Sequence, residues 1–388
     1  MYLILVNFST EQIYFKSISK LILYMRNFLF LCILFIVLIV CSTGCKKNTT
    51  STKARGPVWL VFSKINNKDI VDDNIYTIYP TGGGFVWFGT DSGAISYYSG
   101  IWSSIRDSLS YFIYGNGTII KAQKVLAITE GRQSSIWFGL DGGGIRRYNR
   151  YNPQRAWQRY SPNEPDPINR IPSDFITGLV ADKYRNGDVW VTTLAGVAHY
   201  LPSSTIDGIW YPYSDYSEYF TSSLVRSVTL NPANGWTFFG THDGLPYVHD
   251  ENGLQWGKFN LSGPENSPIH SLAVDYSNTV WMGKTFGTTS WNPNTTKTNH
   301  YDASNTNNQL PNQKINAVAV DFFRPIRWFG TDYGLTRFQD TTWTLFDQTT
   351  TPELPSNKIQ ALAYDGKGNL WIGTNMGIVA YNPEGFEY

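Results

Sequence analysis

Residues 370–382 read Leu-Trp-Ile-Gly-Thr-Asn-Met-Gly-Ile-Val-Ala-Tyr-Asn, and this stretch decides the fold because its pattern occurs seven times along the chain. The ring at its second position falls on Trp87, Trp137, Trp190, Phe238, Trp281, Trp328 and Trp371, at spacings of 43 to 53 residues. A glycine follows six residues after every ring, at Gly93, Gly143, Gly196, Gly244, Gly287, Gly334 and Gly377. Glycine suits a tight hairpin that needs a positive φ. The pattern therefore predicts seven pairs of strands, each pair joined by a tight turn.

Two further elements complete the repeat. A pair of branched apolar residues spaced by three precedes each ring, at Ile75/Ile78, Val125/Ile128, Ile176/Leu179, Val225/Val228, Ile269/Leu272, Ile315/Val318 and Ile359/Leu362. A second, mostly aromatic pair follows each of the first six glycines, at Trp102/Ile105, Trp157/Tyr160, Trp210/Tyr213, Trp256/Phe259, Thr298/Tyr301 and Trp343/Phe346. The missing seventh copy lies at the other end, at Trp59 and Phe62. Four strands at this period predict an all-β, seven-bladed β-propeller of antiparallel four-stranded blades, closed by an N-terminal strand that completes the last blade.

Composition supports a large aromatic core. Aromatic residues make up 16% of the chain and charged residues 16%, whereas charged residues make up ~25% of typical soluble domains. The repeat accounts for 12 of the 14 tryptophans, so we expect these rings to be buried between neighbouring blades rather than to bind ligands. The net charge of +1 gives no indication of nucleic-acid binding, and no motif calls for a cofactor.

The N-terminal region is typical of an export signal. Residues 28–40 are 13 consecutive apolar residues, which fits a signal-peptide core and is shorter than the ~20 residues of a membrane span. Ser42-Thr43-Gly44-Cys45 then resembles the lipobox of bacterial lipoproteins, with Ser42 where Leu, Val or Ile is preferred. The predicted order is an upstream extension from a misplaced start (1–24), a lipoprotein signal peptide (25–44), a tether beginning at the lipidated Cys45 (45–56) and the propeller (57–388). A genuine long n-region and an ordinary signal-peptidase site are the alternatives.

The repeat resembles the two-component regulator propeller repeat, through its Trp-x-Gly-Thr-x-x-Gly-Leu core and its Ile-x-x-Ile lead-in, over residues 57–388. The resemblance implies the fold of periplasmic sensor domains that recognise polysaccharide fragments and are joined to a histidine kinase. The chain departs from the pattern at Phe238, Thr192 and Thr298, where we expect locally reshaped blades. We expect a stand-alone lipoprotein without a kinase, located in the bacterial cell envelope, on the periplasmic side of the outer membrane or at the cell surface.

Candidate ligand-binding residues lie where the repeat varies, at the hairpin tips between the pentapeptide and its glycine. They are Asp91, Asp141, His242, Asp243, Asp332, Tyr333 and Asn375. Acids, a histidine and a ring around one mouth suit hydrogen bonding and stacking with a sugar. Solvated turn residues are the alternative interpretation, because Asp and Asn favour turns. The aromatic-rich loop adds Tyr216, Tyr219 and Phe220 as exposed contact candidates, with loop packing as the alternative.

These observations predict a monomeric ligand-binding or interaction module whose partner is a glycan or an envelope protein. The alternatives are a polysaccharide lyase that uses the mouth, with His242 as the candidate base, and a purely structural scaffold. No His-Glu-x-x-His or Gly-x-Ser-x-Gly motif occurs in the sequence, so enzymatic signals are poor. No metal site is expected, and residues 365–369, Asp-Gly-Lys-Gly-Asn, are interpreted as a hairpin turn rather than a calcium loop.

Overall fold

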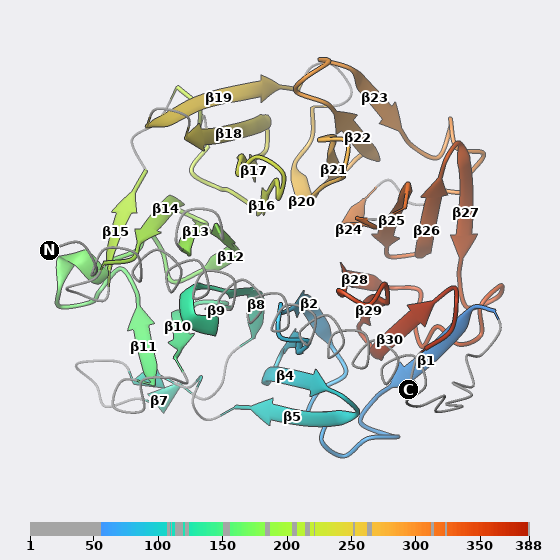
Figure 1. The fold of residues 1–388 in the computed structure, drawn as a ribbon, viewed down its shortest axis with the longest axis horizontal. Helices are drawn as coiled ribbons and strands as arrows, with labels where there is room; N and C mark the ends of the chain where they lie inside the picture. The colour runs from blue at the N-terminus through green and yellow to red at the C-terminus, as the bar shows by residue number, and fades with distance from the viewer. Residues whose placement is uncertain are drawn as a thin grey trace, which may run out of the picture. The chain divides into compact units, whose positions relative to one another are not determined.

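The computed structural model describes residues 56–106, 109, 111–112, 119–120, 124–149, 156–182, 187–203, 208–213, 218–220, 222–250, 253–261, 266–311, 314–322 and 324–386. All of them fall in one compact unit, residues 54–386. This unit is a ring of seven antiparallel four-stranded sheets, as predicted (Figure 1). Among the described residues, helical structure is limited to the short 3-10 turns η2 (Arg132–Ser134) and η4 (Pro167–Asn169).

The strands form four concentric layers. The innermost layer, which surrounds the axis in Figure 1, consists of β2 (Ile75–Pro80), β8 (Val125–Glu130), β12 (Ile176–Asp182), β16 (Ser227–Leu230), β20 (Ile269–Val274), β24 (Ile315–Val320) and β28 (Ile359–Tyr364). The second layer consists of β3 (Val86–Thr90), β9 (Ile136–Leu140), β13 (Asp188–Thr193), β17 (Thr237–Gly240), β21 (Val280–Lys284), β25 (Ile326–Thr331) and β29 (Leu370–Thr374). The third consists of β4 (Gly93–Tyr98), β10 (Gly144–Tyr148), β14 (Gly196–Leu201), β18 (Gly244–Asp250), β22 (Thr288–Trp291), β26 (Gly334–Gln339) and β30 (Gly377–Asn382). The outermost consists of β5 (Ile101–Ile105), β11 (Trp157–Tyr160), β15 (Ile209–Pro212), β19 (Leu254–Asn260), β23 (Thr298–Tyr301), β27 (Thr342–Phe346) and β1 (Val58–Phe62). Two short strands, β6 (Tyr111–Phe112) and β7 (Ile119–Ile120), pair outside the blades.

The predicted closure is confirmed. Strand β1 pairs antiparallel with β30, with Trp59 opposite Tyr381 and Phe62 opposite Ile378. The Trp59 and Tyr381 ring centroids lie 4.3 Å apart. The seventh blade therefore takes its outermost strand from the N-terminal end of the propeller, which covers a sheet edge that would otherwise be open.

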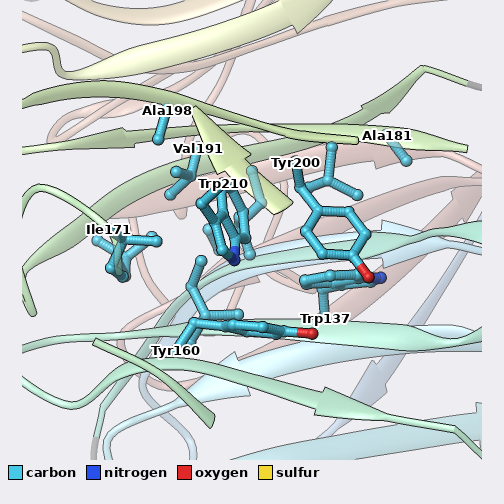
Figure 2. Close-up of a cluster of buried hydrophobic side chains, with 13 residues drawn as sticks. Trp137, Tyr160, Ile171, Ala181, Val191, Ala198, Tyr200 and Trp210 are labelled. Carbon is cyan, nitrogen blue, oxygen red and sulfur yellow. The ribbon is translucent and has the colours of Figure 1, made fainter. Parts of the chain in front are cut away.

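The pentapeptide rings are buried between blades, as predicted. Each contacts an aromatic ring of the next blade, with centroids 4.9 to 6.4 Å apart: Trp87–Phe138, Trp137–Tyr200, Trp190–Phe239, Phe238–Trp291, Trp281–Phe329, Trp328–Tyr381 and Trp371–Phe88. Figure 2 shows one such cluster, in which Trp137 and Tyr160 of the second blade pack against Tyr200 and Trp210 of the third. Burial of these rings couples each blade to its neighbour.

The glycine inside the pentapeptide makes room for the next blade. A Cβ on Gly373 would lie 2.6 Å from Ile75 Cγ2 of the following blade, and one on Gly139 would lie 2.4 Å from Ile176 Cγ2. The third blade has Thr192 at this position, and the facing residue on β12 is Gly178. A Cβ on Gly178 would lie 2.8 Å from Thr192 Oγ1. In the third blade the glycine of this facing pair is therefore on the innermost strand instead of the second strand. The blade still has four strands.

The turn glycines only partly follow the prediction. A positive φ is found at Gly93, Gly196, Gly287, Gly334 and Gly377. The expectation is wrong for Gly244, and in the second blade the positive φ falls on Gly142 and Gly144 rather than Gly143. At Gly334 (φ 138°) a Cβ would also lie 2.7 Å from the carbonyl oxygen of Phe346. The beginning of the third strand therefore lies close to the end of the outermost strand, with no room for a side chain.

At two of the turns between first and second strands, an aspartate holds the indole ring of a pentapeptide tryptophan, Trp281 or Trp371, in place. Asp275 accepts hydrogen bonds from Trp281 Nε1 at 2.9 Å and from the backbone of Ser277, and it pairs with Arg327 of the next blade at 2.5 Å. Asp365 likewise accepts from Trp371 Nε1 at 2.9 Å and from the Lys367 and Asn369 backbone amides. The interpretation of residues 365–369 as a hairpin turn is confirmed by these bonds.

Candidate functional site

One face of the ring carries the hairpins between second and third strands together with the connections that enter the innermost strands. Backbone hydrogen bonds join the two sets, from Gly377 to Asp73, from Gly144 to Asp174 and from Asp141 to Lys124. We call the centre of this face, where hairpin tips meet the first residues of the innermost strands, the mouth.

A β-bulge is repeated at the mouth. In six blades the register between the innermost and second strands shifts after the first residue, so one residue has no partner in the ladder: Tyr76, Leu126, Thr177, His270, Asn316 and Gln360. Arg226 occupies the corresponding place in the fourth blade, directly before β16. A bulge redirects a side chain away from the regular alternation. We call these seven residues the bulge ring, and all seven are half-buried.

The first and second blades contribute a connected polar cluster to the mouth. Asn74 Nδ2 donates to Asp91 Oδ2 at 2.7 Å and to the Tyr76 hydroxyl at 2.5 Å. Lys124 Nζ lies 4.5 Å from the centroid of the Tyr76 ring and 3.5 Å from Asp141 Oδ2. Burial, together with the hydrogen bond to Asp91, raises the pKa of Tyr76 above its usual value. The phenol of Tyr76 is therefore neutral at pH 7.

Lys124 stays charged in this cluster. Burial works against its ammonium form, but Tyr76, Asp141 and Asp91 outweigh that effect and raise the pKa of Lys124. The two acids at the neighbouring hairpin tips thus hold one cation between two blades.

The fifth and sixth blades present amide, imidazole and hydroxyl groups. His270 Nε2 lies 2.8 Å from Thr285 Oγ1 at the hairpin tip of its own blade. Asn316 Nδ2 donates to Asp332 Oδ1 at 2.9 Å and to the carbonyl oxygen of Ile359 in the next blade at 3.0 Å. Burial and the positive charges of Lys314 and Arg226 lower the pKa of His270 to about 4. The imidazole is therefore neutral at pH 7 in this structure.

Three of the predicted hairpin-tip acids face the bulge ring. Asp91, Asp141 and Asp332 each contact the beginning of an innermost strand through the bonds given above. Asp243 instead accepts a hydrogen bond from Thr241 and pairs with Lys258 on the outermost strand β19 at 3.3 Å. In the fourth blade, Asp243 therefore faces the outermost strand instead of the bulge ring.

The remaining tip residues extend into solvent. His242 and Asn375 are exposed, and Tyr333 is 63% exposed. Other exposed apolar side chains at the hairpin tips are Leu194, Phe286 and Met376. The mouth therefore combines a polar floor with apolar tips around it.

The aromatic-rich loop does not present all of its rings. Phe220 is 8% exposed and packs against Phe239 and Trp256, with centroids 5.7 and 5.6 Å apart. Its expected exposure is wrong, because the ring fills the space between the third and fourth blades. Tyr219 is half-buried against the same Trp256. Tyr216 and the lipidation candidate Cys45 lie outside the described residues.

Sequence reasoning missed the bulge ring. Its residues stand inside the Ile-x-x-Ile lead-in, at the first x, which varies as Tyr, Leu, Thr, Arg, His, Asn and Gln. That variation within a constant frame was available as a signal. The position looked like part of a regular strand, and a bulge cannot be recognised without the register.

Two cavities lie on the opposite face, at the turns between first and second strands. One of about 480 Å³ is lined by Gly82, Glu130, Arg132, Ser134 and Gly187, among others. Another of about 380 Å³ includes Asp321, Phe322, Tyr364 and Asp365. None of the candidate residues predicted from the sequence lines either cavity.

Two classes of site find no support in the described part of the chain. It holds no group of three or more His, Cys, Asp or Glu side chains arranged to bind a metal ion. It also holds no helix with the length and apolar content needed to cross a bilayer.

Comparisons with known proteins match one segment of the chain to a family model. Residues 353–376 match the family model described as two component regulator propeller. A curated relative, histidine kinase P4 of Formosa agariphila, is 24% identical over 210 residues, which cover 53% of this chain and 15% of the relative. The chain thus corresponds to a small part of that protein's length.

Solved structures share the fold at low identity. The extracellular domain of a hybrid two-component system from B. thetaiotaomicron superposes with a TM-score of 0.62 at 19% identity, covering 84% of this chain and 41% of that one. A streptogramin B lyase gives 0.61 at 16% identity, covering 84% and 98%. PorZ, a surface component of the type IX secretion system of Porphyromonas gingivalis, gives 0.59 at 18% identity, covering 80% and 46%. The chain is therefore a seven-bladed β-propeller that contains the two-component regulator propeller repeat.

Proposed function

We propose that this chain is an exported propeller, anchored by a lipid at Cys45, whose mouth binds a glycan. The bulge ring is the observation that carries the proposal. Around it, the frame of rings, glycines and apolar pairs is nearly constant from blade to blade, whereas the bulge ring has seven different residue types. Different side chains around one mouth are what a site needs to recognise a ligand that has no sevenfold symmetry.

The chemistry of the mouth suits sugar hydroxyls. Buried polar atoms of the mouth without a hydrogen-bond partner among the described residues include Asn74 Oδ1, Arg226 Nε and Gln360 Oε1. Such atoms are costly unless a ligand or water satisfies them. Hydroxyl groups both donate and accept, and exposed tip side chains such as Tyr333 and Phe286 offer faces for stacking.

The proposed location is the bacterial cell envelope. It rests on the predicted signal and on the compared proteins, which include extracellular sensor domains and a surface secretion component. In the same setting an envelope protein could occupy the mouth, and it is the second partner to screen.

The test is a glycan screen followed by calorimetry. Asp332→Ala and Tyr333→Ala should each weaken binding of the best glycan by ~1–3 kcal/mol, through a lost polar partner or lost stacking. Tyr276→Ala is the matched control, because Tyr276 is 51% exposed at a turn on the opposite face. Equal affinities for all three variants and the wild type would contradict a site at the mouth.

The same experiment separates the alternative functions. A lyase would shorten the bound glycan and lose turnover in His242→Ala, whereas a binding module leaves the glycan intact. If neither a glycan nor an envelope protein binds the wild type in a broad screen, the proposal fails and the scaffold hypothesis takes its place.

A further inference from the structure

One quarter of the mouth gathers positive charge. Arg226, His270 and Lys314 stand at the beginnings of the innermost strands of the fourth, fifth and sixth blades. These strands are direct neighbours in the ring, since β20 lies between β16 and β24. The positive charges of Arg226 and Lys314 both act on the His270 ring, and its strand lies between theirs. Two cations, Arg226 and Lys314, therefore flank a neutral imidazole in this part of the mouth.

Arg226 differs from Arg327 and Arg324, each of which is paired with a carboxylate. Arg327 is paired with Asp275 at 2.5 Å, and Arg324 with Asp321 at 2.6 Å. The Arg226 Nε is buried and has no hydrogen-bond partner among the described residues. A buried polar atom without a hydrogen-bond partner is unfavourable.

The hairpin-tip acids that face the bulge ring are bonded to residues other than Arg226. Asp91 and Asp141 belong to the cluster of the first and second blades, and Asp332 is bonded to Asn316. No described carboxylate is among the charges that act on His270. These acids, including Asp332 on the sixth blade, are thus already bonded to other groups, and none of them is paired with Arg226.

We infer that this quarter of the mouth binds an anionic substituent, a carboxylate or a sulfate, on an acidic sugar residue. The inference rests on the proposed glycan-binding function and names the ligand class. A guanidinium can donate two parallel hydrogen bonds to either oxyanion. Lys314 adds a point charge, and His270, held through Nε2 by Thr285, keeps Nδ1 as a polar group. Phe286, on the same hairpin as Thr285 and 47% exposed, provides a ring against which a sugar can stack.

The experiment compares matched ligands by calorimetry. One arm uses a panel of uronate-containing oligosaccharides, the second uses the same oligosaccharides after reduction of their carboxyl groups, and the third uses sulfated oligosaccharides. The wild type should bind a uronate or a sulfated ligand at least about tenfold more tightly than its neutral counterpart, and the preference should shrink at high salt. The arm that gives the tighter complex identifies carboxylate or sulfate as the anion.

Variants assign the preference to named side chains. Arg226→Gln and Lys314→Ala should each remove most of the preference for the acidic ligand. Lys358→Ala is the matched control, because Lys358 precedes the innermost strand of the seventh blade as Lys314 precedes that of the sixth. Lys358→Ala removes the same charge from the mouth and should leave most of the preference for the acidic ligand intact. Melting temperatures show whether each variant is folded, and Arg226→Lys keeps the charge if Arg226→Gln is unstable.

The outcomes are distinct for the two proposals. Equal affinity for acidic and neutral ligands would overturn the anion site and leave glycan binding standing. Equal losses in the Lys314 and Lys358 variants would also overturn it, because they would indicate a diffuse field. Failure to bind any member of the panel would overturn the anion site, and failure in the broad glycan screen as well would overturn the glycan-binding function.

Discussion

At the scale of single residues, departures from the repeat are compensated by nearby changes. Thr192 replaces the glycine that elsewhere makes room for the next blade, and Gly178 opposite it is the smaller partner. The corresponding pairs in other blades are Ala127 with Gly139 and Ala361 with Gly373. Two facing positions thus share one limited volume, and either strand can hold the glycine.

This exchange predicts a non-additive pair of mutations. Gly178→Ala should destabilise the domain by ~1–3 kcal/mol, because the new Cβ meets Thr192 Oγ1 in a close-packed interior. Adding Thr192→Gly recreates the alanine–glycine pair of other blades and should recover much of that loss. Chemical denaturation of the two single variants and the double variant measures the coupling. Purely additive losses would show that the two sites do not share their space.

A second prediction concerns Asp275. Burial opposes its ionisation, but hydrogen bonds from Ser277, Trp281 and Arg327 outweigh it and lower the pKa of Asp275 below its usual value. Asp275→Ala leaves Arg327 without its buried partner and should cost ~3–5 kcal/mol. Asp69→Ala, at an exposed site, is the control.

The pH dependence follows from the direction of that shift. A carboxyl whose folded-state pKa is depressed stabilises the protein above the ordinary value of ~3.9. The contribution is lost as the pH falls through the folded-state pKa. As the pH is lowered from 7 to 3, the melting temperature should therefore fall further for the wild type than for Asp275→Ala. Parallel curves would contradict a role for Asp275 in acid stability.

At the scale of the elements, the sequence was sufficient for the strands and insufficient for the site. Ring, glycine and lead-in spacing identified the seven blades because each marks a packing contact that cannot be relaxed. Exposure of Phe220 was mispredicted, because proximity to a strand end does not reveal which blade a loop covers. The bulge ring, with Tyr76 and His270 in it, depends on strand register, which alternation alone does not determine.

The closing strand gives the prediction at this scale. Deletion of residues 57–62 removes β1, exposes the edge of β30 and takes Trp59 from its contact with Tyr381. Loss of a large packed ring alone costs ~3–5 kcal/mol, so the melting temperature should fall markedly. Deletion of residues 48–53 in the predicted tether removes the same number of residues and should have almost no effect. Equal melting temperatures for the two deletions would contradict the contribution of β1.

At the scale of the whole molecule, the ring distributes its roles between two faces. The mouth receives the hairpin tips of all seven blades, so Asp91, His270 and Asp332 come together only when the ring is complete. The opposite face carries the aspartate turns, such as that of Asp275, which fix the blades to one another. Changes at the mouth should therefore alter binding with little effect on stability, and changes at the turns should do the reverse.

Anchoring is tested on the whole protein. Cys45→Ala should abolish lipid attachment and move the protein from the membrane fraction to the soluble fraction, because a thiol at this position is required for lipidation of the predicted signal. Cys41→Ala, four residues earlier, is the control and should leave the protein in the membrane fraction. Mass spectrometry of the mature N-terminus provides the direct measurement. An unmodified N-terminus at another residue would contradict the lipoprotein prediction.

The pairing of β1 with β30 also sets a chronology for the molecule. The ribosome makes β1 before any other strand of the propeller, yet the partner of β1 is the last strand to be made. The blades between these two strands can each form their own hairpins before β1 is paired, because neighbouring strands of a blade are close in sequence. The final contact has the largest sequence separation in the domain, and such contacts form slowly. The propeller therefore remains an open arc until β30 has been made, and it closes into a ring when β1 pairs with β30.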